Sequence, residues 1–169
     1  MSDPMNLPIL VARESPADGP VVERLVERAF GPGRFARTAY RLREAAPPDP
    51  ELGFVARVST LLVGSNRMTR ITAGGVPALF LGPLTVDPAF RNRGIAKALM
   101  ETSLEAAKEA GHRLVILVGD EPYYRRFGFA RVAAGRLVMP GPVDPARLLF
   151  RELVAGSLEG AAGKVTAGS

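Results

Sequence analysis

Residues 81–96 read LGPLTVDPAFRNRGIA and predict a β-strand that breaks into a turn and opens directly into an α-helix. Pro88 follows Asp87 and ends the strand, and apolar side chains at helical spacing predict a helix over 94–110. The apolar run at 114–118 is typical of a buried strand. A strand–helix–strand unit forces a parallel pairing through a right-handed crossover, so this stretch indicates an α/β fold.

The turn at the start of this helix suits an anion. The first N–H groups of a helix have no intrahelical acceptor and lie at the positive end of the macrodipole. Gly94 and Ala96 are small, so a phosphate can approach the backbone closely. Arg91 and Arg93 add full charges beside them. The residues therefore predict a phosphate or pyrophosphate site, although small residues at a strand-to-helix turn are also common without one.

The rest of the chain predicts strands and helices around this unit. Strands are expected over 7–13, 54–60, 61–71, 76–86, 129–133, 136–139 and 148–153, and helices over 21–30 and 35–45. Gly74-Gly75 predicts a tight hairpin. The segment 160–169 is rich in Gly and Ala, and we expect it to be ordered only if it docks on the rest. We expect one domain over 1–169, with a core at about 7–155 and a tail at 156–169.

The composition argues against several classes of site and partner. Twenty-two Lys and Arg against 17 Asp and Glu give a net charge of +5, spread without a basic tract, so nucleic acid is not implied. The absence of Cys excludes disulfides and thiolate metal sites, and His112 alone cannot form a multi-His zinc site, so no metal is expected. No apolar run has the length of a membrane span and residues 1–13 lack a signal layout, so we expect no membrane association and a cytoplasmic protein.

Two motifs give the chain a family resemblance. Residues 91–96, RNRGIA, match Q/R-x-x-G-x-G/A, the signature of the GNAT superfamily of acyl-CoA-dependent N-acetyltransferases. Residues 119–129, GDEPYYRRFGF, contain a segment similar to the Y-x-x-x-G-F element of that family and resemble a small bacterial branch of it. The order and separation of the two motifs fit the family, and the resemblance covers roughly residues 7–131.

The resemblance implies acetyl-CoA as co-substrate and assigns residues to it. The N–H groups of the motif loop, beside Arg91, would hold the CoA pyrophosphate: Asn92, Arg93, Gly94, Ile95, Ala96 and Lys97. The strand edge Leu84, Thr85 and Val86 would pair with the pantetheine arm after a bulge, and an N–H there would polarise the thioester carbonyl. Gly82-Pro83 fits a bulge on its residues alone, because Pro donates no ladder hydrogen bond.

A second set of assignments concerns the chemistry. Tyr124 matches the family's Tyr that protonates the departing thiolate; the less favoured alternative is a core Tyr with a surface hydroxyl. Tyr123 is expected to pack or to form a wall of the acceptor pocket, and Asp120 to cap its helix. No general base is evident: Glu27, Glu51 and a water-mediated route are candidates, and His112 is expected in a surface turn.

Two functions remain open at this stage. One is an enzyme that moves acetyl from acetyl-CoA to a primary amine of a small molecule or peptide, and the retention of Tyr124 favours it. The other is a non-catalytic acyl-CoA-binding or regulatory module, which the lack of an evident base keeps open. The fold implied is an α/β (α+β) domain with a mixed, mostly antiparallel sheet of six or seven strands, about four helices and one parallel strand pair splayed into a cofactor cleft. A longer acyl donor and a homodimer through the C-terminal strands also stay open.

Overall fold

Segments rich in apolar and β-branched residues form nine strands in the part of the chain that the computed structural model describes, residues 7–31, 42, 45 and 47–168. They are β1 (Ile9–Arg13), β2 (Phe54–Val58), β3 (Leu61–Ala73), β4 (Val76–Val86), β5 (Leu114–Val118), β6 (Ala130–Arg131), β7 (Leu137–Val138), β8 (Leu148–Glu152) and β9 (Gly163–Ala167). Seven follow the order β1-β2-β3-β4-β5-β8-β6, while β9 pairs with β3 and β7. Only β4–β5 and β7–β9 are parallel among these pairings, so the sheet is mixed and mostly antiparallel, as predicted.

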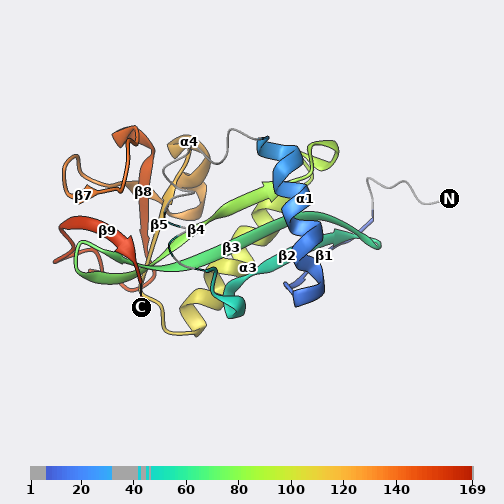
Figure 1. Ribbon diagram of the computed structural model, residues 1–169, viewed down its shortest axis with the longest axis horizontal. Coiled ribbons are helices and arrows are strands. Elements are labelled where there is room, and N and C mark those ends of the chain that lie inside the picture. The colour runs from blue at the N-terminus through green and yellow to red at the C-terminus, as the bar shows by residue number, and fades with distance from the viewer. Residues whose placement is uncertain (1–6, 32–41, 43–44, 46, 169) are drawn as a thin grey trace.

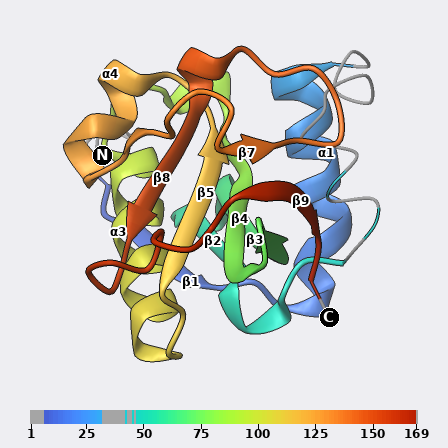
Figure 2. The same cartoon turned by 90° about the vertical axis from the view of Figure 1, so that its left-hand side faces the viewer.

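Helices cover both faces of the sheet. They are α1 (Gly19–Phe30), α3 (Ile95–Glu109) and the single turn α4 (Glu121–Tyr124), with 3-10 turns η2 (Pro16–Asp18), η4 (Pro50–Leu52), η5 (Pro88–Phe90), η6 (Arg125–Phe127) and η7 (Pro145–Arg147). Figures 1 and 2 show α1 on one side of the sheet and α3 on the other. Of the helix predicted over 35–45, only Leu42 and Ala45 belong to the described residues, and both are helical. Within the described ranges, no helix is both long and apolar enough to cross a bilayer.

The helix α3 packs very closely on the sheet at Gly64. A Cβ atom on Gly64 would lie 2.7 Å from Ile95 Cγ2 and 3.0 Å from Leu99 Cδ1. Buried side chains of β3, β4 and β5 continue this contact along the helix toward Met100 and Leu104. Glycine at position 64 therefore sets the distance between the start of α3 and the sheet.

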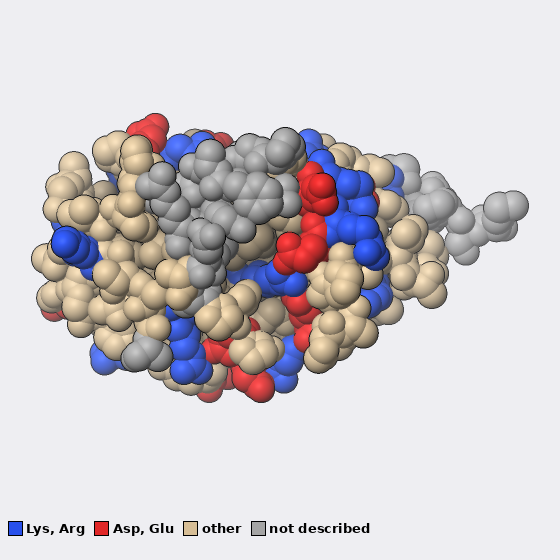
Figure 3. Space-filling model, in the orientation of Figure 1, with Lys and Arg blue, Asp and Glu red and all other residues tan. Residues whose placement is uncertain are grey.

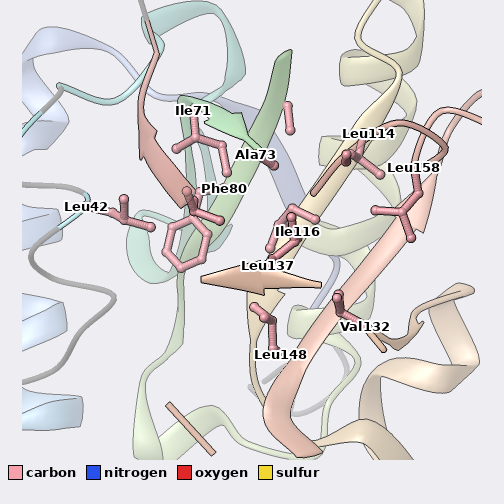
Figure 4. Packing of buried hydrophobic residues seen from close by; sticks show 13 residues of the cluster. Leu42, Ile71, Ala73, Phe80, Leu114, Ile116, Val132, Leu137, Leu148 and Leu158 are labelled. Carbon is pink, nitrogen blue, oxygen red and sulfur yellow. The ribbon is translucent and has the colours of Figure 1, made fainter. Parts of the chain in front are cut away.

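On the opposite face the core divides into two apolar clusters. One lies under α1 and contains Val22 and Leu25 with Val55. The other lies toward the C-terminal strands. In this cluster the Phe80 ring lies beside the Leu42 side chain (Figure 4). The side chains of this second cluster are Leu42, Ile71, Ala73, Ala78, Phe80, Leu114, Ile116, Val132, Leu137, Leu148, Leu158, Ala161 and Val165.

Two irregularities in β4 open the sheet. Strand β4 is paired with β5 only at Leu79–Val115 and Phe80–Ile116, and beyond these pairs the two strands separate. In the β3–β4 register, Asn66 lies opposite Leu84 and Met68 opposite Leu81, so two residues of β4, Gly82 and Pro83, face one residue of β3. This is the bulge predicted at Gly82-Pro83, and the splayed parallel pair is likewise confirmed.

The C-terminal region adds more structure than the sequence predicts. Six or seven strands were too few, because Gly163–Ala167 forms β9, and Ala162 N–H donates to the Gly74 carbonyl at the hairpin between β3 and β4. The segment assigned to a tail also contributes Leu158, Ala161 and Val165 to the core. Since β8 pairs with β5 and β6, and β9 with β3 and β7, these strands use their backbone edges within the chain. A homodimer through them stays a prediction.

Candidate active site

The turn before α3 presents backbone N–H groups to an open space. Gly94 is the N-cap residue, with φ +80°, and Ala98 N–H donates to its carbonyl at 3.0 Å. Within the described ranges, no capping side chain and no turn carbonyl accepts a hydrogen bond from the N–H groups of 92–97. A Cβ on Gly94 would meet nothing within 4 Å. These donors are therefore available to an external acceptor.

Charged side chains surround this turn. The Arg93 guanidinium carbon lies 4.9 Å from the centroid of the Phe90 ring, and Lys97 Nζ lies 3.9 Å from a carboxylate oxygen of Glu101. Asn92 adopts φ +64°, a left-handed conformation that Asn tolerates better than most residues. Asn92 and Gly94, both with positive φ, reverse the direction of the chain after β4, and α3 begins at the next residue, Ile95.

A pocket of about 220 Å³ connects this turn with the splayed strands. The described residues that line it are Ala29, Phe30, Leu84, Thr85, Val86, Arg91, Ala96, Tyr123 and Tyr124. The pocket thus joins the end of α1, the edge of β4 after the bulge, the start of α3 and the turn α4. Six of the predicted site residues, Leu84, Thr85, Val86, Arg91, Ala96 and Tyr124, lie along this one cavity, while the remaining five belong to the adjoining turn.

Tyr124 is held between an aromatic cluster and a glycine. Its ring centroid lies 4.9 Å from that of Tyr123 and 6.0 Å from that of Phe129, both in edge-to-face geometry. A Cβ on Gly119 would overlap the Tyr124 ring, so the ring occupies the space that a side chain at position 119 would need. Tyr124 is half-buried and also packs against the α3-side core. The ring is therefore fixed by packing at the pocket wall.

Tyr123 forms a neighbouring part of the same wall and packs against the α3-side core, and its contact with an acceptor stays a prediction. Burial raises the pKa of its phenol, and Arg126, whose guanidinium carbon lies 5.0 Å from the ring centroid, partly offsets that rise. Tyr123 consequently stays protonated at neutral pH.

The capping role predicted for Asp120 is wrong. Asp120 occupies the N-cap position of α4, but its side chain makes no cap hydrogen bond. Pro122 at the second helical position has no N–H, which removes one of the two donors that an N-cap side chain normally uses. The next residue, Glu121, instead accepts hydrogen bonds from Arg125 and Arg131, and these lower the pKa of its carboxyl group. The partly buried Glu121 therefore ties α4 to β6.

None of the predicted candidates for a general base lies among the described lining residues of the pocket. Glu27 is on the exposed side of α1, and Glu51 is 75% exposed and pairs with Arg13 at 3.7 Å. His112 lies after the end of α3, as expected of a turn residue, but it is half-buried. Burial, together with Arg70, lowers the pKa of His112, while Asp49 opposes this change. Its imidazole is therefore neutral at pH 7, but the structure does not bring it to the pocket.

Ion pairs anchor α1 over the sheet. Arg67 of β3, opposite the β4 bulge, donates to both carboxylate oxygens of Glu14 at 3.0 and 2.8 Å and to Glu23 of α1 at 2.7 Å. Burial alone would lower the pKa of Arg67, but these hydrogen bonds outweigh that effect and raise it. At the other end of α1, Arg28 pairs with Asp87 at 3.3 Å. Charged side chains of both signs gather over the part of this face that α1 covers (Figure 3).

Sequence reasoning missed several residues that shape the pocket. Ala29 and Phe30 lie in the helix predicted over 21–30, but nothing in the sequence singled them out as pocket residues. Gly119 had a signal, since it follows a buried strand and precedes the Tyr pair, yet its contact with Tyr124 depends on how the turn between them places the ring. Arg67 gave no signal, because a charged residue within a strand usually indicates a solvated face.

Comparisons with known proteins agree with this geometry. Residues 23–132 match the family model described as an acetyltransferase (GNAT) domain. Over 160 residues the chain is 29% identical to the N-acetyltransferase YhbS of Escherichia coli strain K12, which covers 93% of this chain and 95% of that protein. The crystal structure of E. coli YhbS in complex with CoA gives a TM-score of 0.80 at 28% identity, over 99% of this chain and 93% of that chain. The crystal structure of a GNAT family acetyltransferase from Brucella melitensis in complex with acetyl-CoA gives a TM-score of 0.61 at 26% identity. The match covers 85% of this chain and 96% of that chain.

Proposed function

Because the chain belongs to the GNAT acetyltransferase family and is an acetyl-CoA-dependent N-acetyltransferase, we propose that it acetylates a primary amine of a small molecule or peptide by direct attack on the thioester. The observation that carries this proposal is a pocket that joins the edge of β4, the start of α3 and Tyr124. The relatives crystallised with CoA or acetyl-CoA support the identity of the donor.

The proposal assigns the cofactor to the turn and to the strand edge. The N–H groups of residues 92–97 hold the pyrophosphate, with the Arg91 charge beside them. The backbone of Leu84–Val86, which β5 leaves unpaired, hydrogen bonds the pantetheine arm. This arrangement directs the thioester toward Tyr123 and Tyr124 at the other side of the pocket.

The reaction then proceeds by transfer of the acetyl group between two nucleophiles. The lone pair of the amine forms a bond to the carbonyl carbon, and an N–H on the β4 edge stabilises the oxyanion that develops. The C–S bond breaks, the Tyr124 hydroxyl donates its proton to the sulfur, and the nitrogen loses its surplus proton to water. A thiol has a pKa of about 8.5 and a phenol about 10, close enough for this transfer.

Tyr124→Phe tests the proposal, with Tyr123→Phe as the matched control on the same turn. We expect Tyr124→Phe to lower kcat by roughly 100-fold or more while the affinity for acetyl-CoA is retained, because the phenyl ring keeps the packing and loses only the acid. Tyr123→Phe should keep kcat within about threefold. The measurement is thiol release from acetyl-CoA over a panel of primary amines. Binding of acetyl-CoA without turnover of any amine would favour the non-catalytic module instead.

A further inference from the structure

Three buried hydroxyl groups lie on the α1-facing side of the sheet without a partner. Ser65, Thr69 and Thr85 are 0%, 0% and 1% exposed, and the hydroxyl oxygen of each makes no hydrogen bond. A buried hydroxyl without a partner destabilises the fold, so its presence requires an explanation such as a bound water or a ligand. Three together, between the apolar clusters under α1 and under the C-terminal strands, form a polar strip.

The pairing of β3 with β4 places these three hydroxyls on different sides of the β4 bulge. Ser65 lies directly opposite Thr85, after the bulge, whereas Thr69 lies opposite Phe80, before it. Leu84 and Val86 pack with the start of α3, so alternation along the strand directs the Thr85 side chain to the opposite face, toward α1. Among the described lining residues of the pocket, Thr85 is the one member of the three. Ala29 and Phe30 of α1 line the same pocket.

We propose that the Thr85 hydroxyl binds the amino group of the acceptor, a step that rests on the proposed function. The backbone of Thr85 lies on the edge assigned to the pantetheine arm, and its side chain lies on the α1 side, so one residue contacts both substrates. The hydroxyl oxygen accepts one N–H of the neutral amine, and the nitrogen keeps its lone pair for the carbonyl carbon. Thr85 gives up no proton. The surplus proton of the nitrogen leaves to water, and the sulfur is protonated as above.

A hydroxyl contact also has a consequence for the protonation state of the bound acceptor. A carboxylate at this position would stabilise the ammonium form, whose nitrogen has no lone pair to attack with. A hydroxyl accepts a hydrogen bond without that charge preference. The site therefore does not stabilise the unreactive ammonium form, and an uncharged primary amine can bind there with its lone pair free.

The test compares Thr85→Val, Thr85→Ser and the matched control Thr69→Val. Val has the shape of Thr without the hydroxyl, and Thr69 is as buried as Thr85 and equally without a partner. With the best-used amine of a panel of primary alkylamines, we expect Thr85→Val to lower kcat/KM for the amine by roughly five- to tenfold. KM for acetyl-CoA should be unchanged, Thr85→Ser should retain the activity, and Thr69→Val should behave as the wild type.

A stability measurement separates this role from a structural one. In the ligand-free protein, Thr85→Val and Thr69→Val should keep or raise Tm, because each removes a buried hydroxyl that has no partner. A clear fall in Tm for Thr85→Val would show an internal partner and overturn the inference. Amine kinetics unchanged by Thr85→Val would also overturn it and leave the proposed function standing. A wild-type protein that acetylates no amine would contradict the proposed function itself, and the inference with it.

Discussion

The two faces of the sheet are built on different principles. Under α3 the face is almost wholly apolar and so tightly packed that Gly64 has no room for a Cβ atom. Its described buried polar side chains include Asn66, whose Nδ2 donates to Ser103 Oγ at 2.9 Å, while Asn66 Oδ1 is buried without a partner. Under α1 the face carries the Arg67 ion pairs and the hydroxyls without partners. The two faces therefore differ in degree: the α3 face is mainly apolar with one polar pair, whereas the α1 face carries ion pairs and three buried hydroxyls without partners.

The pocket lies where these two faces meet at the edge of β4. Leu84 and Val86 face α3, and Thr85 faces α1, so the same three residues belong to both environments. The α3 face sets the position of the N–H groups at the start of α3. The α1 face carries the polar strip, of which Thr85 is the residue that lines the pocket. The comparison therefore predicts that substitutions on the two faces have different consequences.

The largest effect on stability is expected at Arg67. Arg67→Met should lower the free energy of unfolding by about 2–3 kcal/mol, because it leaves the nearly buried Glu14 without its partner. This is less than for a fully buried pair, since Glu23 is 63% exposed. Urea denaturation measures the change. The matched control is Arg13→Met, whose pair with Glu51 is exposed and should contribute less than about 1 kcal/mol. An equal loss of unfolding free energy in the two variants would contradict the claim that the Arg67 ion pairs stabilise the protein more than an exposed surface pair does.

A somewhat smaller effect is expected on the α3 face. Gly64→Ala should destabilise the protein by about 1–3 kcal/mol, because the new methyl group forces Ile95 and Leu99 away from the sheet. The displacement reaches the first residue of α3, so affinity for acetyl-CoA should fall as well. Gly19→Ala is the control, since a Cβ there meets nothing within 4 Å. If Gly64→Ala matched this control in denaturation, the close contact between α3 and the sheet would be contradicted.

Much of the fold follows from local pattern. Strand β4 and strand β5 have the bounds that the sequence predicts, because both are apolar runs ended by clear turn residues. The bulge at Gly82-Pro83 was also predictable, since Pro cannot donate in the ladder. Strand β9 was not, because a Gly- and Ala-rich segment has little strand propensity and is ordered by its pairing with β3 and β7.

The site divides in the same way. Residues 91–97 and Tyr124 carry motif signals, and the structure places them around one pocket and its adjoining turn. Phe30 and Arg67 depend on contacts between segments distant in the chain, which a single sequence does not contain, and Gly119 depends on how the turn before Tyr124 places its ring. The cap predicted at Asp120 failed because Pro122 removes one of the donors that such a cap uses.

Calorimetric titration of acetyl-CoA into Gly94→Glu and Gly111→Glu tests the central claim, that the start of α3 binds the pyrophosphate. The two glycines flank the same helix, have φ of +80° and +88°, and leave equally open space for a Cβ. Both variants therefore carry the same backbone strain and the same new charge. We predict that Gly94→Glu weakens binding by roughly 100-fold or more through steric block and repulsion, while Gly111→Glu stays within about threefold of the wild type. Equal affinities for the two variants would contradict the account.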